Sequence, residues 1–236
     1  MKTFCSMKKT EETKKLSCDF CGRSFIREST IYNHVCEQKR RWQDKDKHGN
    51  RIGYQAWVEF LSKNTNSKKR DYTDFIKSSV YIAFVKFGNY CVDVNVVQPN
   101  RYLDWLLKNN IKIHTWCNDS VYTDFIKDYL LRENPLDAIN RSFETCNTLS
   151  EQQGILSKDI LRYGNFNKIC YNITKGKISP WMLYQSSSGT KFLDTLDESQ
   201  VKLIVDYINP EAWALKFIRN TDEVTRIKQI LEENGF

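Results

Sequence analysis

The sequence predicts a mainly α-helical protein in which a small metal-bound ββα-type module precedes an irregular helical domain. Three observations lead to this fold class. Four metal-ligating side chains lie within nineteen residues near the N-terminus, positive charge is concentrated in the first 70 residues, and capped segments with helical periodicity fill residues 71–236. With 236 residues, of which 40% are hydrophobic, the chain is long enough to bury a substantial core.

Changes in composition along the chain predict four parts. Residues 1–16 form a flexible basic arm, residues 17–37 the metal-bound module, residues 38–70 a basic linker or helix, and residues 71–236 the helical domain. The polar, lysine-rich stretch from Asn64 to Arg70 is the expected boundary between the basic front and the neutral body.

The first predicted metal ligands are Cys18, Cys21 and His34. Two cysteines separated by two residues form a knuckle that can wrap around a tetrahedral Zn²⁺ ion, and His34 follows Cys21 after twelve residues. Chains of this length have too little apolar surface to fold alone, so we expect the metal to supply the folding energy of this module.

Cys36 is the local candidate for the fourth ligand, and Cys5 and His48 are the alternatives. Helical residues two positions apart point about 200° away from each other. Cys36 therefore reaches a metal held by His34 only if the helix unwinds or ends just after His34. Three thiolates and one imidazole would then form a closed structural site, with no open position for catalysis.

The spacing of two hydrophobic residues extends this pattern. Phe25 lies four residues after Cys21, Ile31 six after Phe25, and His34 three after Ile31. Over residues 16 to about 40 the chain thus resembles the zinc-finger family with two cysteines and two histidines. The resemblance implies a zinc-bound ββα-type finger, but the positions where the family carries its second histidine hold Gln38, Lys39 and Arg40.

The same resemblance implies which side chains would face the major groove of DNA. Arg27, Thr30 and Asn33 match the base-reading positions of the family, so Arg27 would pair with guanine and Asn33 with adenine. One finger covers only about three base pairs, so phosphate contacts from neighbouring basic residues are also expected.

The charge distribution favours a polyanionic partner for the N-terminal part. Residues 1–70 hold 17 Lys and Arg against 8 Asp and Glu, a net charge of +9, whereas residues 71–236 hold 19 against 21, a net charge of −2. We expect nucleic acid, DNA rather than RNA, and no membrane; solvated lysines on a flexible arm are the alternative. The predicted phosphate contacts are Lys39, Arg40, Arg41, Lys45 and Lys47. Trp42 either stacks on an unpaired base or packs within the protein.

The body is expected to be helical, because apolar residues recur at helical intervals and polar caps precede them. The predicted helices are Asp71–Phe87, Pro99–Asn109, Asn118–Glu133, Pro135–Thr148, Ser157–Arg162, Glu198–Ile208, Pro210–Arg219 and Asp222–Asn234. The predicted N-caps are Asp71, Asn118, Asn134, Asn209 and Thr221.

Three stretches fit this scheme less well. Residues 90–97 predict either a short strand or the continuation of a buried helix, because β-branched residues alternate there. Residues 173–195 lack clear helical periodicity, and residues 186–191 are expected to form a solvent loop. Residues 72–77 recur identically as residues 122–127, through either a duplication or chance, and both copies are expected to contribute core side chains.

The chain begins without the apolar run of a signal peptide and contains no apolar stretch long enough to span a membrane, so a reducing cytoplasm is expected. In that compartment Cys91, Cys117, Cys146 and Cys170 are expected to be buried small hydrophobes. No catalytic constellation and no small-molecule substrate is evident from the residues, so an enzyme is not expected.

The expected function is that of a zinc-finger nucleic-acid-binding protein. The alternative is an interaction adaptor whose finger docks on an enzyme, with a further protein partner bound through the helical domain. Residues 18–42, 83–88 and 101–105 resemble a group of uncharacterised zinc-finger proteins of T-even-like bacteriophages. That resemblance implies an accessory factor in DNA replication, transcription or host takeover, acting in the host bacterial cytoplasm.

Overall fold

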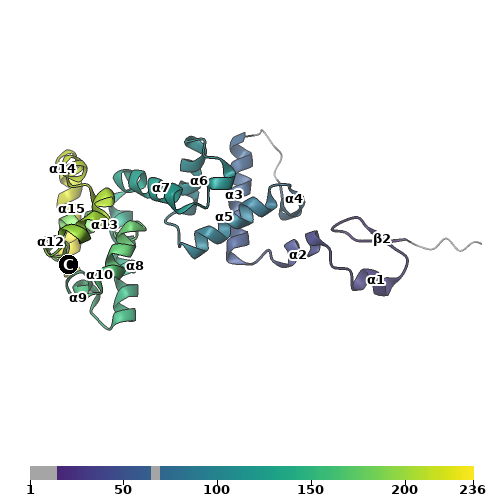
Figure 1. Cartoon of the computed structure of the whole chain (residues 1–236), viewed down its shortest axis with the longest axis horizontal. Helices are drawn as coiled ribbons and strands as arrows, with labels where there is room; N and C mark the ends of the chain where they lie inside the picture. Colours follow the sequence, from purple (N-terminus) through teal and green to yellow (C-terminus); the bar gives the residue numbers. More distant parts are fainter. Residues whose placement is uncertain (1–14, 65–69) are drawn as a thin grey trace, which may run out of the picture. The chain divides into compact units, whose positions relative to one another are not determined.

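The protein is mainly α-helical, as predicted, in a computed structural model that describes residues 15–64 and 70–236 (Figure 1). The sheet found in these residues is a two-stranded antiparallel ribbon of β1 (Leu16–Ser17) and β2 (Ser24–Phe25), in which Leu16 pairs with Phe25. The chain divides into two compact units, Met1–Val92 and Asp93–Phe236. No helix within the described ranges is both long and apolar enough to cross a membrane.

The described residues of the first unit form five helices after the ribbon. They are α1 (Glu28–Tyr32), α2 (Glu37–Gln43), α3 (His48–Asn64), α4 (Tyr72–Lys77) and α5 (Tyr81–Asp93). Helix α4 packs against α2 and α3, so the expected boundary near residue 70 lies inside this unit. The aromatic side chains that α4 contributes to this packing were expected to belong to a separate helical domain, residues 71–236.

Helices α3 and α5 approach closely because glycines remove side chains at their crossing. A Cβ atom on Gly88 would lie 1.9 Å from the carbonyl oxygen of Gly49, and one on Gly53 would lie 2.5 Å from the carbonyl oxygen of Phe84. Gly49 lies in the first turn of α3. Its role is to permit backbone-to-backbone packing.

The predicted helix Asp71–Phe87 is split in two. Asp71 caps α4 in a capping box, with its carboxylate accepting hydrogen bonds from the backbone of Thr73 and Asp74. Ser78 then adopts an extended conformation, and its hydroxyl accepts from the backbone N–H of Val80 at 3.3 Å just before α5 begins. Serine competes in this way with helical hydrogen bonding, which ends α4 after six residues.

The second unit consists of ten α-helices and two short 3₁₀ turns within its residues 93–236. The helices are α6 (Pro99–Lys108), α7 (Asp119–Arg132), α8 (Pro135–Gln153), α9 (Ile160–Tyr163), α10 (Phe166–Thr174), α11 (Pro180–Gln185), α12 (Ser187–Asp194), α13 (Glu198–Ile208), α14 (Pro210–Arg219) and α15 (Thr221–Glu233). The turns are Ile113–Thr115 and Ser157–Asp159. The predicted ranges of α13 and α14 coincide with the observed ones.

The predicted caps succeed where asparagine precedes proline. Asn134 accepts hydrogen bonds from the backbone of Leu136 and Asp137, and Asn209 accepts from Ala212. Asn118 stands at the N-cap of α7 but makes no side-chain cap hydrogen bond. The N-cap of α15 is Asn220, so the prediction of Thr221 was wrong by one residue.

The expected solvent loop at residues 186–191 is wrong. Ser186 is buried and caps α12, where its hydroxyl accepts from the backbone of Gly189 at 2.9 Å. Gly189 packs so closely that a Cβ there would lie 2.5 Å from the carbonyl oxygen of Leu183. The short helices α11 and α12, of six and eight residues, give too few turns for a helical period to be recognised.

The remaining ambiguous stretches also take definite forms. Helix α5 continues to Asp93 and residues 94–97 form a turn and loop, so the helical alternative holds for the first half of residues 90–97. The repeated hexapeptide makes up the whole of α4 in its first copy but lies inside α7 in its second. Most of its apolar residues are buried, namely Phe75, Ile76, Tyr122, Phe125 and Ile126.

The core of the second unit forms around α8 and α11. Trp181 and Trp213 lie edge to face with ring centroids 6.1 Å apart, and Phe217 packs against both. The carboxylate of Glu133 is fully buried, where it accepts from the Ser179 hydroxyl at 2.5 Å and pairs with the Arg141 guanidinium at 2.5 Å. A buried carboxylate is tolerated only with such partners.

Candidate metal centre

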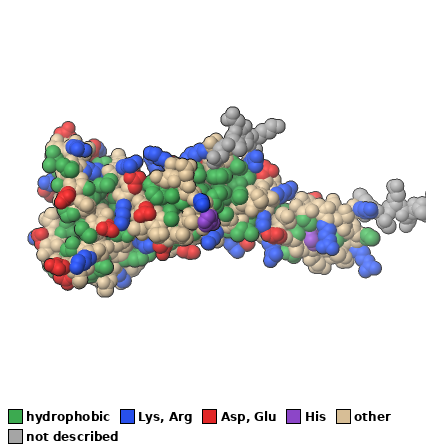
Figure 2. Space-filling model, turned by 45° about the horizontal axis from the view of Figure 1, so that its top comes forward, with side chains coloured by type: hydrophobic (Ala, Val, Ile, Leu, Met, Phe, Trp, Pro, Cys, Tyr) green, Lys and Arg blue, Asp and Glu red, His purple; other side chains and the backbone are tan. Residues whose placement is uncertain are grey.

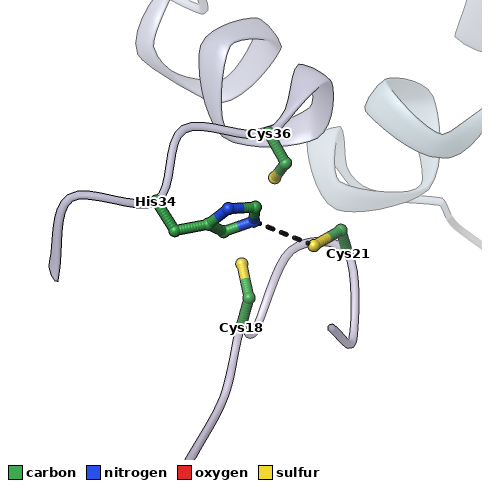
Figure 3. Close-up of side chains that lie close together, drawn as sticks. All are labelled: Cys18, Cys21, His34 and Cys36. Atoms are coloured by element: carbon green, nitrogen blue, oxygen red, sulfur yellow. Dashed lines mark hydrogen bonds between the residues drawn. The ribbon is translucent and has the colours of Figure 1, made fainter. Parts of the chain in front are cut away.

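Cys18, Cys21, His34 and Cys36 converge on one point near the N-terminus. One ligand atom from each of the four lies within 4.8 Å of the others (Figure 3). The Nε2 atom of His34 lies 3.2 Å from the Cys21 sulfur, so the ring faces the thiols with that nitrogen. These are the four residues that the sequence predicted as ligands.

The first two ligands come from the turn between β1 and β2. The backbone N–H of Cys18 donates to the carbonyl of Arg23 at 2.9 Å, and the N–H of Gly22 donates to the carbonyl of Cys18 at 2.8 Å. Gly22 has φ of +71°, a conformation that glycine adopts without steric penalty. The glycine after Cys21 therefore lets the chain reverse tightly enough to bring both sulfurs to one side.

The last two ligands lie on either side of a helix break. Helix α1 ends at Tyr32, with Asn33 as its C-cap, so His34 and Cys36 are not on one continuous helix. Cys36 is instead the N-cap of α2, and its sulfur accepts a hydrogen bond from the backbone N–H of Lys39 at 3.4 Å. The sequence predicted that Cys36 can reach a metal held by His34 only if the helix unwinds or ends near His34. The structure meets this condition, because α1 has already ended and the chain is free to turn Cys36 back toward His34.

The thiols of the knuckle influence each other's ionisation. The backbone N–H of Cys21 donates to the Cys18 sulfur and lowers the pKa of Cys18. A hydrogen bond from the Arg23 backbone to the Cys21 sulfur also favours a lower pKa for Cys21. Desolvation and the adjoining thiols of Cys18 and Cys36 outweigh this hydrogen bond, so the pKa of Cys21 is raised. Several thiolates in one place repel each other, and a bound cation relieves that repulsion.

The spacing of the four atoms fits a tetrahedral ion. With metal–sulfur bonds of about 2.3 Å, ligand atoms at the corners of a tetrahedron lie about 3.8 Å apart. The observed upper limit of 4.8 Å requires only a small inward movement of side chains. The cluster is therefore suited to a metal ion, and its three sulfurs favour a soft or borderline one.

Apolar contacts around the cluster are few. The Phe25 ring lies 4.7 Å from the His34 ring, centroid to centroid, and Phe25 and Ile31 are only half-buried. On the side of the knuckle, Phe20 packs on Trp42, whose ring also contacts Tyr72 at 5.9 Å and lies under the ammonium of Lys45 at 4.7 Å. Of the two roles considered for Trp42, the structure shows packing.

The predicted base-reading residues lie together on the finger. Arg27 is the N-cap of α1, Thr30 lies in the helix and Asn33 follows it, and all three are exposed. Thr30 and Asn33 also line a shallow concavity of about 500 Å³, together with Ser29 and Arg23. Lysine and arginine side chains are visible over this end of the protein in Figure 2.

The predicted phosphate contacts differ in how far their side chains are already engaged within the protein. Arg41 is only 15% exposed, since its guanidinium donates to the carbonyl of Ile76 at 2.6 Å, pairs with Glu37 and lies over the Tyr81 ring. Lys47 pairs with Asp44 at 2.8 Å, and Lys45 lies over Trp42.

Lys39 and Arg40 complete this set. The ammonium of Lys39 donates to the carbonyl of His34 at 3.2 Å, which ties α2 to the metal-binding segment. Arg40 is exposed. The sequence reasoning missed the packing roles of Lys39 and Arg41, because the α2–α4 contact that occupies Arg41 joins residues 35 positions apart.

Of the two alternative ligands, His48 is not part of the cluster in the described residues. His48 begins α3 and is exposed, and Cys5 lies outside the described residues. Of the cysteines expected to be buried, Cys91, Cys146 and Cys170 are buried and Cys117 is only half-buried. Burial raises the pKa of Cys146 to about 12 and that of Cys170 to about 11. Such thiols remain protonated and unreactive at neutral pH.

Comparison of the chain with protein-family models, with curated proteins and with solved structures finds no match.

Proposed function

We propose that the four-residue cluster holds a structural Zn²⁺ ion and that the finger built on it binds nucleic acid, DNA in preference to RNA. The observation that carries this proposal is the convergence of three cysteine sulfurs and one imidazole nitrogen within 4.8 Å. Zinc is the usual ion of such a closed Cys₃His site. All four positions are filled by protein ligands, which favours a structural role over catalysis.

The surface of the finger supports a nucleic-acid partner. Arg23, Arg27 and Arg40 are exposed and take no part in the ion pairs of the described residues. Polar side chains of Ser29 and Thr30 line the concavity beside them. Cations around a polar concave face are what phosphate contacts and base-edge contacts require.

Binding to duplex DNA tests the proposal through its salt dependence. Neutralising about three phosphates predicts a slope near −3 in a plot of log affinity against log salt. Fluorescence anisotropy with the full chain should give that slope with duplex DNA and a weaker affinity with RNA. Arg40→Glu should weaken binding to all sequences alike and reduce the slope by about 1, whereas Arg27→Ala should relax base preference.

The matched control is Arg219→Glu, which makes the same charge change at an exposed arginine of the second unit. It should leave the slope unchanged. Cys21→Ser should abolish binding, since it removes a ligand on which the finger depends. Absence of binding at low salt, or equal effects of Arg40→Glu and Arg219→Glu, would refute the nucleic-acid role.

A second function, as a protein-interaction adaptor, is favoured by apolar side chains on the finger. Ile26, Tyr32 and Val35 are 76%, 84% and 58% exposed. Such residues are enriched in protein interfaces and add little to phosphate binding. A partner captured by the full chain after nuclease treatment, and lost with Tyr32→Ser but not with Arg40→Glu, would favour this function over the first.

The cellular role follows only from the resemblance to phage proteins. We propose an accessory factor in DNA replication, transcription or host takeover, acting in the host cytoplasm. Sequencing of nucleic acid crosslinked to the protein in infected cells, with Cys21→Ser as the control, would identify the process. Recovery of the same sequences with Cys21→Ser would contradict a role for the finger.

A further inference from the structure

The second unit contains a polar groove that the finger's function does not involve. Its volume is about 930 Å³, and it lies between one face of α8, helix α10 and residues 95–98. Pockets for small organic ligands span about 300 to 1,000 Å³. The groove is therefore large enough for a ligand the size of a nucleotide.

The walls of the groove are rich in side-chain amides. Six line it, namely Asn95, Gln98, Asn140, Gln152, Asn167 and Asn172. Asn172 donates to the carbonyl of Lys168 at 2.7 Å, and the other five form no side-chain hydrogen bond with another described residue. Each uncommitted amide offers one donor group and one acceptor side by side, which is the pattern that matches the edge of a nucleobase.

One wall holds the backbone in an unusual conformation. Asn95 and Gln98 have φ of +51° and +54°, and they are two of the three non-glycine residues with positive φ in the described chain. Between them, Val96 and Val97 are buried, and the N–H of Val97 donates to the Tyr122 hydroxyl at 3.0 Å. Strained backbone held in place by its surroundings is concentrated at ligand sites.

The groove also holds a cation without a partner. Lys177 is half-buried, and no carboxylate among the described residues forms an ion pair with it. Burial, together with the nearby charge of Lys175, lowers the pKa of Lys177. An anionic group in the groove would compensate this ammonium, and a neutral sugar would not.

Two carboxylates limit the charge that a ligand can carry. Asp137 and Glu144 line the same groove and are exposed. A nucleic-acid strand carries a phosphate on every nucleotide, so it would pass close to these two carboxylates and be repelled. A ligand with a single phosphate can keep that group beside Lys177. The exposed ring of Tyr171, which also lines the groove, is available for stacking with a base.

We propose that this groove binds a free mononucleotide, with its phosphate near Lys177 and its base held by the amides of α8 and α10. The site is independent of the finger, because all of its residues belong to the second unit. Binding of the nucleotide therefore requires neither the metal centre nor nucleic acid.

The test is isothermal titration calorimetry of the full chain with each of the common ribo- and deoxyribonucleoside monophosphates. At least one should bind, and Lys177→Gln and Asn140→Ala should each weaken it at least tenfold. Asn140 is exposed on α8, where alanine is well tolerated, so Asn140→Ala should fold normally. This variant therefore keeps the test valid even if Lys177→Gln misfolds. Lys191→Gln, at an exposed lysine outside the groove, is the matched control and should have no effect.

Other probes separate the alternatives. Inorganic phosphate and ribose 5-phosphate should bind at least tenfold more weakly than the nucleotide, and equal affinity would overturn recognition of the base. A short single-stranded oligonucleotide that binds more tightly than the mononucleotide and depends on Lys177 would overturn the assignment to a free nucleotide. No binding of any nucleotide at 10 mM (about 3 kcal/mol of affinity) would overturn the proposal entirely.

The finger variant keeps this result distinct from the proposed function. Cys21→Ser should abolish DNA binding and leave nucleotide affinity unchanged. A loss of nucleotide binding in Cys21→Ser would place the nucleotide at the finger and contradict the groove.

Discussion

The finger, residues 16–36, and the second unit differ in what they bury. Cys18 is the one buried residue among the described residues 15–36, whereas the second unit buries large side chains such as Trp181 and Trp213 under several helices. The finger's two strands have two residues each and its helix has five. Elements this short cannot exclude enough apolar surface from water to offset their conformational entropy.

The difference implies two kinds of stability within one chain. In the finger, a single ion bound by four side chains would replace a hydrophobic core. In the second unit, many packing contacts and hydrogen bonds each contribute a little, so no single one of them decides the fold. Removal of individual groups should therefore have very different consequences in the two regions.

Metal removal should have the largest effect. Structural zinc supplies on the order of 10 to 16 kcal/mol of apparent binding energy, so chelation should unfold the finger and leave the second unit folded. In two-dimensional NMR spectra, a strong chelator should collapse the signals of residues 16–36 to random-coil positions while those of α8 and α11 persist.

Cys146→Ala is the control for this experiment, because it removes a cysteine from the second unit. It should leave one zinc ion per chain by elemental analysis, whereas Cys36→Ser should reduce the affinity for zinc. If chelation leaves the spectrum of the finger unchanged, the finger does not depend on a metal ion for its stability, and the proposed difference between the two regions is wrong.

The buried ion pair between Arg141 and Glu133 should be a sensitive point of the second unit. Arg141→Met would leave the carboxylate of Glu133 buried without its cation, and breaking such a pair costs about 3–5 kcal/mol. Desolvation raises the pKa of Glu133 above its usual 4.5, although the Arg141 charge opposes the shift. The folded state therefore holds this proton more tightly than the unfolded state, so stability falls as pH rises above 4.5 until the folded pKa is passed.

The pH dependence provides the check on this interpretation. Without Arg141 the pKa of Glu133 rises further, so urea unfolding should show a larger loss of stability at pH 8 than at pH 5. Replacing Glu133 with glutamine in the Arg141→Met background should recover part of the loss at pH 8. A loss that is the same at both pH values would mean that the buried charge is not its cause.

The helix crossing in the first unit tests packing without charge. Gly88→Ala would drive a Cβ into the Gly49 carbonyl, and overpacking of this kind costs about 1–3 kcal/mol despite the higher helix propensity of alanine. Amide hydrogen exchange should accelerate in α3 and α5 and stay unchanged in the second unit. Lys86→Ala, on the exposed side of α5, should change exchange little. Comparable acceleration in both variants would refute the close crossing.

Sequence reasoning succeeded where the causes of structure are local. The Cys-x-x-Cys spacing predicted the knuckle, and asparagine before proline marks the starts of α8 and α14. Caps and metal knuckles depend on residues a few positions apart, so they can be read directly from the chain.

It was less successful where the causes are distant. The helix that follows Ser186 is stabilised by burial against α11, and the burial of Arg41 depends on Ile76 and Tyr81. Neither contact leaves a periodic signal in the sequence. The groove of the second unit was not anticipated for the same reason, because it combines residues from 95 to 177 that only the fold brings together.

The smallest predicted effect concerns the helix caps and compares two asparagines of the second unit. The side chain of Asn134 accepts from two backbone N–H groups at the start of α8, whereas Asn118 stands at the start of α7 without a side-chain cap hydrogen bond. Asn134→Ala should therefore cost about 1 kcal/mol in urea unfolding, and Asn118→Ala clearly less. Equal losses would show that the cap hydrogen bonds do not account for the effect. A loss far above that of an ordinary cap would show that the second unit, like the finger, depends on a single point rather than on many small contributions.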